Sequence, residues 1–372
     1  MSCYHPLIAY PDGKTELGKT RYKIVSSKGV NHLEDVQKYH PEAILVPCGH
    51  CIGCRLDYSR TWADRMMLEL ETSKKAVFLT LTYDSEHAHP VQFERFKQRI
   101  FDDNVILTGA YSDLESHDMI LPVSYDFVYR DVQLFLKLIR KDNNGKKGNP
   151  YNRLRFYCAS EFGDETHRPH FHMILFGLGL EDFPDKEFWA RTKLNDILYT
   201  SEYLNSKWKC GRVILADVSW RTCAYVARYV TKKLSGDMKV IYDIWNCTPE
   251  KAYMSRRPGI GAEYLLQHPD CLDMSNINIS TPDGGMKIQI PKYYLKFLNK
   301  NCLISSKDPE KIVLNPLYNP ELYDRIMSEK MNIANANLII KDSYTGLNYV
   351  DYLESEEYLK SENTKILKRA QI

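Results

Sequence analysis

Two histidines one residue apart, His170 and His172, have the residue type and spacing best suited to chemistry in this sequence. They lie in the apolar run Arg168–Gly177, which has strand length and is bounded by a proline and a glycine. Because side chains alternate between the faces of a strand, both imidazoles would point to the same face of a sheet. Two imidazoles on one face can bind a metal ion, and the alternative is a semi-buried pair that only forms hydrogen bonds.

A carboxylate beside this pair would complete such a site. Residues 154–160 predict a second strand that leads into a turn, and Glu161 follows it, nine positions before His170. That separation suits a hairpin that brings the end of one strand close to its neighbour. Two imidazoles and one carboxylate favour a divalent ion with open coordination positions.

The cysteine-rich run Cys48–Cys54 is a second candidate metal site. Its three cysteines follow a C-x2-C-x2-C spacing, and two glycines let the backbone turn so that the sulfurs converge, which a tetrahedral zinc site needs. The fourth ligand could be Cys3, His5 or His50, and an iron-sulfur cluster or plain thiols are the alternatives to zinc. The ligand set that we expect for a structural zinc ion is Cys48, Cys51, Cys54 and Cys3.

Residues 219–234 predict a helix that could carry a nucleophile. At about 100° per residue, one arc is apolar and the opposite arc is polar. The apolar arc contains Cys223, Val226, Ala227, Val230 and Leu234, and the polar arc contains Tyr225, Arg228, Tyr229 and Lys232. Tyrosines four residues apart usually only pack together. Phenols flanked by cations, however, suit attack on a phosphodiester, because the cations would stabilise a phenolate or the charge of the phosphorane.

The elements that must position these residues follow from hydrophobic periodicity. We expect helices at residues 55–74, 131–141, 185–204 and 219–234, and strands at residues 77–83, 154–160, 169–177 and 212–218. The chain beyond Lys251 is less regular and is expected to contain a polar helix over residues 320–335.

Length and composition limit the possible classes of protein. With 372 residues, 44% of them hydrophobic, the chain can bury one large core or two modest ones. The formal net charge is only +2, so a nucleic-acid interface must be argued from local clusters. No apolar run approaches the roughly 20 residues that span a bilayer, and the N-terminus does not resemble a signal peptide. We therefore expect a protein of the cytoplasm without membrane partners.

Three motifs in order resemble those of rolling-circle replication initiators, the HUH endonucleases. They are residues 78–84 (FLTLTYD), 168–172 (RPHFH) and 225–233 (YVARYVTKK). Residues 48–55 and 254–261 are also similar to segments of this family, and the closest resemblance is to the replication-associated proteins of gokushovirus-type microviruses. The resemblance covers roughly residues 40 to 300.

The resemblance implies a role for each matching residue. His170 and His172 match the metal-binding pair, and Glu161 lies where related initiators supply a third ligand. Tyr225 and Tyr229 match an arrangement in which one phenol nicks and the other rejoins, and Lys232 lies where the family's helix lysine aids the reaction. The implied α+β fold is a central five-stranded antiparallel sheet flanked by helices. We expect an N-terminal segment with the cysteine knuckle (1–60), an endonuclease domain (61–245) and a helical C-terminal extension (246–372).

The function implied is an origin-specific single-strand DNA endonuclease and ligase that uses Mg²⁺ or Mn²⁺ and initiates rolling-circle replication of a small phage genome in the host bacterial cytoplasm. Its partners would be single-stranded and replicative-form phage DNA and a host polymerase. A host helicase is expected too, because the sequence has no G-x-x-x-x-G-K-[ST] motif. Further DNA contacts are expected from Arg228, Lys233, Arg256 and Arg257. The alternatives are a relaxase or transposase of the same chemistry, and a zinc-stapled, non-enzymatic single-stranded DNA-binding protein.

Overall fold

The computed structural model describes residues 3–14, 20–26, 36–91, 125–143, 154–163, 168–232, 242, 247–274, 276–281, 284–299, 302–304, 312–329, 332 and 349–368. The chain forms two compact units. One, the sheet unit, runs from Ser59 to Pro291, and the other, the terminal unit, combines the first 58 residues with the chain from Lys292 onward.

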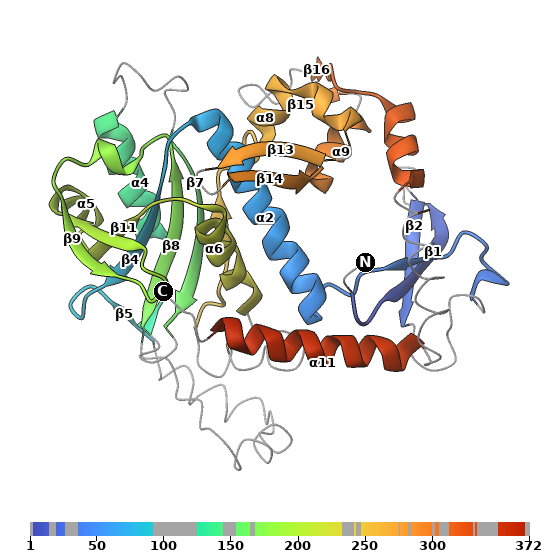
Figure 1. The fold of residues 1–372 in the computed structure, drawn as a ribbon, viewed down its shortest axis with the longest axis horizontal. Coiled ribbons are helices and arrows are strands. Elements are labelled where there is room, and N and C mark those ends of the chain that lie inside the picture. Colours follow the sequence, from blue (N-terminus) through green and yellow to red (C-terminus); the bar gives the residue numbers. More distant parts are fainter. Residues whose placement is uncertain are drawn as a thin grey trace, which may run out of the picture. The chain divides into compact units, whose positions relative to one another are not determined.

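A seven-stranded antiparallel sheet is the centre of the sheet unit (Figure 1). Its strand order is β12-β7-β8-β4-β11-β10-β9. The strands are β4 (Ala76–Tyr83), β7 (Arg155–Phe162), β8 (Pro169–Phe176), β9 (Lys186–Arg191), β10 (Ile197–Ser201), β11 (Gly211–Ala216) and β12 (Ala252–Met254). The four strands expected from the sequence are confirmed as β4, β7, β8 and β11. The sheet is wider than the five strands that the resemblance implied.

Helices flank both faces of this sheet, in keeping with the predicted α+β class (Figure 1). On one face, α4 (Tyr129–Asn143) and α5 (Glu202–Trp208) cover a core that includes Leu79, Leu81 and Val213, all fully buried. On the other face, α6 (Trp220–Lys232) contacts β7 and β8, and Trp62 of α2 (Ile52–Ser73) packs on Tyr157 of β7 with ring centroids 5.1 Å apart. We call this second face the histidine face, because His170 and His172 point to it.

The helix expected over residues 185–204 was wrong. Strands β9 and β10 form a hairpin there, and helix α5 begins only at Glu202. Apolar residues in this short segment fit either periodicity, and the local turn decides between them. The turn is closed by hydrogen bonds between Thr192 and Asp196, and Asn195 adopts a left-handed conformation with φ of 68°.

The expectation of a helical C-terminal extension was only partly right. Its helices are α8 (Ala262–Gln267), the 3-10 helix Pro269–Asp273, α9 (Lys292–Leu298), residues 320–329 and α11 (Tyr349–Lys368). It also contains two hairpins, β13 (Asn276–Thr281) with β14 (Gly284–Gln289) and β15 (Cys302–Ile304) with β16 (Ile312–Leu314).

The terminal unit joins the two ends of the chain. A three-stranded sheet of order β2-β1-β3 is built from β1 (Leu7–Lys14), β2 (Thr20–Ser26) and β3 (Ile44–Val46). Helix α11 contributes Glu357, whose Oε2 lies 2.6 Å from His5 Nε2. This contact ties the C-terminal helix to the residues beside Cys3. The remaining described elements are β5 (His89–Pro90), β6 (Tyr125–Asp126) and the 3-10 helix Leu180–Asp182, which belong to the sheet unit.

Candidate active site

Glu161, His170 and His172 converge on the histidine face. Glu161 of β7 is the direct register partner of His170 on β8, and His172 follows two residues along the same face. The Oε2 atom of Glu161 lies 2.9 Å from His170 Nε2 and 2.8 Å from His172 Nε2. The three ligand atoms are within 4.8 Å of one another, so the hairpin brings together the three residues that the sequence grouped.

The second nitrogen of each imidazole shows why a cation fits here. His170 Nδ1 lies 3.1 Å from the Arg168 carbonyl oxygen, which can only accept, so Nδ1 must carry a hydrogen. In a neutral imidazole, Nε2 is then an acceptor that faces a second acceptor, the Glu161 carboxylate. Two acceptors at 2.9 Å require a cation, either a proton on the ring or a metal ion between them. His172 Nδ1 lies 3.1 Å from Thr80 Oγ1, which likewise directs Nε2 at the carboxylate.

The carboxylate of Glu161 is held in its ionised form. The residue is buried, and burial by itself would raise the pKa of the carboxyl group. Hydrogen bonds to His170 and His172, together with the charges of these rings, outweigh burial and hold the pKa well below its usual value. Glu161 is therefore charged at neutral pH, as a metal ligand must be.

Tyr225 and Tyr229 of α6 lie directly against these histidines. The ring of Tyr229 stacks on that of His172, with centroids 4.4 Å apart and an interplanar angle of 11°. The ring of Tyr225 meets His172 edge-on at 5.2 Å and Tyr229 at 4.7 Å. Residues from two strands and one helix thus place two phenols beside the three candidate metal ligands.

The environment of the two phenols differs from the one the sequence predicted. The apolar arc of α6 is buried as expected, since Cys223, Val226 and Ala227 are fully buried. The phenol arc does not face solvent, however, because Tyr229 is only 5% exposed while Tyr225 is half-buried. Helical periodicity distinguishes the two arcs, but it does not reveal that the polar arc also packs against a sheet.

Burial makes Tyr229 the harder phenol to ionise. Burial raises the pKa of Tyr229 far above its ordinary value, and hydrogen bonds with Tyr225 and with the Glu161 carboxylate raise it further. Because a carboxylate only accepts, the Tyr229 hydroxyl donates to Glu161. In this arrangement Tyr229 is an un-ionised phenol bound to a candidate metal ligand.

Two buried polar residues of α2 position α6, and the sequence gave no sign of them. The Ser59 hydroxyl donates to the carbonyl oxygen of Ala224 at 3.1 Å, and the Trp220 indole N–H donates to Asp64 Oδ1 at 2.8 Å. Ser59 and Asp64 are 3% and 6% exposed, so both contacts are shielded from water. These contacts fix the rotation of α6 about its axis and therefore where its phenols point. From the sequence, Asp64 had been taken for part of a solvated face.

The residues expected to contact DNA are not all gathered at this site. Arg228 lies on α6 beside Tyr229 and is half-buried. Arg256 and Arg257 are exposed in the turn that follows β12. The side chain of Lys232, the last residue of α6, and the whole of Lys233 lie outside the described residues.

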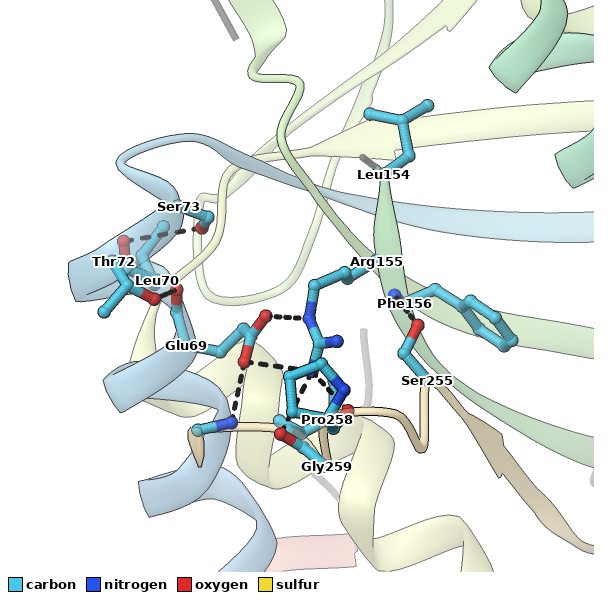
Figure 2. Close-up of polar contacts among 12 residues, drawn as sticks. Glu69, Leu70, Thr72, Ser73, Leu154, Arg155, Phe156, Ser255, Pro258 and Gly259 are labelled. Atoms are coloured by element: carbon cyan, nitrogen blue, oxygen red, sulfur yellow. Dashed lines mark hydrogen bonds and ion pairs between the residues drawn. The ribbon is translucent and has the colours of Figure 1, made fainter. Parts of the chain in front are cut away.

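A buried ion pair holds the turn that carries Arg256 and Arg257. Figure 2 shows the Glu69 carboxylate of α2 paired with Arg155 of β7. Arg155 Nη2 also donates to the carbonyl oxygens of Pro258 and Gly259, each at 3.0 Å. A second arginine of α2, Arg65, donates to the carbonyl oxygen of Ile260 at 2.8 and 3.0 Å, and the Gly261 N–H donates to Glu69 at 2.7 Å. The two exposed arginines therefore extend from a backbone that is fixed at several points.

The second candidate metal site lies in the terminal unit, where Cys3 joins the knuckle. Four sulfurs, those of Cys3, Cys48, Cys51 and Cys54, lie within 4.8 Å of one another. The Sγ–Sγ distances are 4.0 Å for Cys48–Cys54 and 3.9 Å for Cys51–Cys3. A tetrahedron with metal–sulfur bonds of about 2.3 Å has edges of about 3.8 Å, so the spacing fits one ion. Of the three candidates for a fourth ligand, the structure groups Cys3 with the knuckle, whereas His50 is exposed and His5 is bonded to Glu357.

Backbone N–H groups point at these sulfurs, as they do around metal-bound thiolates. The N–H of Cys48 donates to Cys3 Sγ at 3.2 Å, that of Cys51 to Cys48 Sγ at 3.4 Å, and that of Tyr4 to Cys51 Sγ at 3.4 Å. Burial raises the pKa of the Cys3 thiol to about 11, although the Cys48 N–H opposes this. A bound cation would be needed to keep so many sulfurs ionised together.

None of the helices in the described ranges combines the length and apolarity needed to cross a membrane.

Comparison with known proteins places these sites in a family context. A family model for the replication-associated protein ORF2 matches residues 76–234, which include both histidines and both tyrosines. The chain is 26% identical over 363 residues to the replication-associated protein ORF2 of Spiroplasma virus 4, covering 96% of this chain and 94% of that protein.

Two further relatives carry the same designation. The chain is 29% identical over 258 residues to the replication-associated protein VP4 of Bdellovibrio phage phiMH2K, covering 68% of each chain. It is 23% identical over 334 residues to the replication-associated protein ORF4 of Chlamydia phage 1, covering 88% of this chain and 69% of that protein. No solved structure matches the chain. The chain therefore belongs to the family of phage replication-associated proteins that these relatives represent.

Proposed function

We propose that this protein takes part in phage genome replication as an origin-specific single-strand DNA nickase and strand-transferase, which starts rolling-circle synthesis through a 5′-phosphotyrosine intermediate. The observation that carries the proposal is the juxtaposition on the histidine face. Two phenol rings lie 4.4 and 5.2 Å from the ring of His172, whose Nε2 is 2.8 Å from Glu161. A nucleophile and a set of metal ligands at this separation suit phosphoryl transfer.

Glu161, His170 and His172 would hold Mg²⁺ or Mn²⁺ in this proposal. The bound ion supplies Lewis acidity, which lowers the energy of the charge that develops on the scissile phosphate. The protein contributes the direction of the imidazoles, which Arg168 and Thr80 fix from the far side of each ring.

The tyrosines would perform the exchange of bonds. The hydroxyl of Tyr225 or Tyr229 loses its proton as its oxygen bonds to phosphorus, and the bond from phosphorus to the 3′ oxygen breaks. The 3′ oxygen takes up a proton and becomes the free 3′-hydroxyl that primes synthesis by a host polymerase. The second tyrosine would cut the regenerated junction after one circuit and allow rejoining. The covalent bond conserves the energy of the phosphodiester, so no water nucleophile is required.

The predicted endonuclease domain, residues 61–245, contains all five of these residues. Lys232 and Arg228 would stabilise negative charge near the phenols, and Lys233, Arg256 and Arg257 would contact phosphates of the DNA. Unwinding would fall to a host helicase, and the reaction would take place in the host cytoplasm.

Incubation of the purified protein with single-stranded origin DNA and Mn²⁺ tests this proposal. We expect a covalent adduct that mass spectrometry maps to Tyr225 or Tyr229 and that EDTA prevents. The double variant Tyr225→Phe, Tyr229→Phe should form none, and cleavage by it at the parent rate would refute the tyrosine mechanism. Binding without any adduct, insensitive to EDTA, would favour the non-enzymatic alternative, a zinc-stapled single-stranded DNA-binding protein.

We also propose that the four clustered cysteines bind a structural Zn²⁺ ion. The near-tetrahedral sulfur spacing and the N–H···S bonds support this ion. Metal analysis of the purified protein should give about one zinc per chain, and a Cys54→Ser variant should lose it and unfold at lower temperature. Cys158→Ser is the matched control, because this buried cysteine lies in the sheet unit. Full zinc content in Cys54→Ser, or iron in the parent protein, would overturn the assignment.

A further inference from the structure

The histidine face is only partly covered by helices. Helix α6 contacts β7 and β8, which carry the candidate metal ligands. On the next two strands, β4 and β11, side chains of the same face reach solvent: Thr82 is half-exposed and Arg212 is exposed. Their neighbours on the opposite face, Leu81 and Val213, are fully buried. A sheet whose second face is open and polar beside a reaction site offers a surface for the rest of the substrate.

Register connects this open surface to the candidate metal site. Thr82 of β4 is the direct partner of His170, and Arg212 of β11 is the direct partner of Thr82. Adjacent strands are about 4.8 Å apart, so the backbone of Arg212 lies about 10 Å from that of His170 on the same row. A strand of DNA with a phosphate near His170 could therefore pass over Arg212 within one or two nucleotides.

An exposed tryptophan extends the row to the edge of the sheet. Trp189 lies on β9, the last strand in the sheet order, and is 45% exposed. The guanidinium carbon of Arg212 lies 4.1 Å from the centroid of the Trp189 ring, which places the indole on the histidine face. A solvent-exposed indole paired with a guanidinium group provides a flat surface for a nucleobase and a positive charge for its phosphate.

We propose that Thr82, Arg212 and Trp189 form a strip that binds the single-stranded DNA flanking the scissile phosphate, with Arg212 at a backbone phosphate and Trp189 stacked on a base. This inference rests on the proposed nicking function, because it assumes that the scissile phosphate lies at His170. A protein partner is less well matched to the strip, because the strip begins at the register partner of a candidate metal ligand.

Binding of labelled single-stranded oligonucleotides to the full chain tests the strip. Fluorescence anisotropy is measured in the Tyr225→Phe, Tyr229→Phe background, so that cleavage does not interfere. Trp189→Ala should weaken binding about tenfold, since stacking on one aromatic side chain contributes on that order, and Trp189→Phe should restore most of it. Arg212→Ala should weaken binding and reduce the steepness of its salt dependence by about one phosphate contact.

Phe188→Ala is the matched control. Phe188 is also exposed, at 63%, and precedes Trp189 on the same strand. Its register partner is Tyr199, which packs against the core beneath α4 and α5, so Phe188 belongs to the opposite face. The control variant should bind DNA like the parent.

The outcomes separate this inference from the proposed function. If the parent protein nicks DNA but Trp189→Ala and Arg212→Ala bind it as tightly as the parent, the strip is wrong and the nicking function stands. If the parent fails to nick, yet Trp189→Ala weakens binding and Phe188→Ala does not, the strip stands as a DNA-binding surface and the nicking function fails. A Trp189→Ala variant that changes the oligomeric state and leaves DNA affinity unchanged would identify the surface as a protein interface and overturn the inference.

Discussion

Thr80 provides the sharpest test of how the metal site is positioned. Its hydroxyl is 3.1 Å from His172 Nδ1, on the side of the ring away from Glu161. Thr80→Val keeps the β-branched shape that suits β4 and removes only the hydrogen-bonding group. A hydrogen bond of this kind contributes about 1 kcal/mol, and its loss leaves the ring free to rotate away from the ion.

That free energy sets the expected size of the effect. Since about 1.4 kcal/mol corresponds to a tenfold change, the apparent affinity for Mn²⁺ should fall roughly tenfold. The rate of nicking at saturating Mn²⁺ should stay close to that of the parent, because the ligands themselves are unchanged. Titration of nicking with Mn²⁺, alongside calorimetric measurement of Mn²⁺ binding, separates the two quantities.

Thr82→Val is the matched control, since Thr82 lies on the same strand and face but opposite His170. It should bind Mn²⁺ with near-parental affinity. If Thr80→Val binds Mn²⁺ as tightly as the parent while His172→Ala does not, Thr80 does not position the ring. If His172→Ala also binds normally, the metal assignment itself is refuted.

Three further predictions follow from burial and charge. Because Tyr225 is the more accessible phenol, Tyr225→Phe should slow the first cleavage by about 10³-fold or more, whereas Tyr229→Phe should retain first cleavage and lose rejoining, as scored on labelled oligonucleotides. Glu69→Gln should destabilise the protein by about 3–5 kcal/mol in denaturant titrations, since it leaves a buried guanidinium unpaired, whereas Glu71→Gln on the same helix should cost about 0.5 kcal/mol or less. Burial, then Cys158 and Tyr253, raise the pKa of Tyr129 to about 12, so the unfolded chain loses this proton near pH 10 and the folded chain keeps it. Stability should therefore fall as pH rises from about 10 to 12, and Tyr129→Phe should flatten that fall.

Local pattern predicted the elements that carry the candidate site. The alternation of His170 and His172 along a bounded apolar run was sufficient to place both on one face of a strand. The short separation from Glu161 was sufficient to predict a hairpin, and the two residues are direct register partners. The same kind of reasoning failed at residues 185–204, because a short apolar segment fits both periodicities and the turn at Asn195 decides between them.

The sequence by itself determined which side chains share a face, since that depends only on the repeat of a strand or a helix. It did not determine what covers each face. The burial of Tyr229 against His172, the contacts of Ser59 and Asp64 with α6, and the meeting of Arg212 with Trp189 all depend on pairings between distant segments. Such pairings are fixed by strand register and by the packing of the whole core, which no local window of sequence contains.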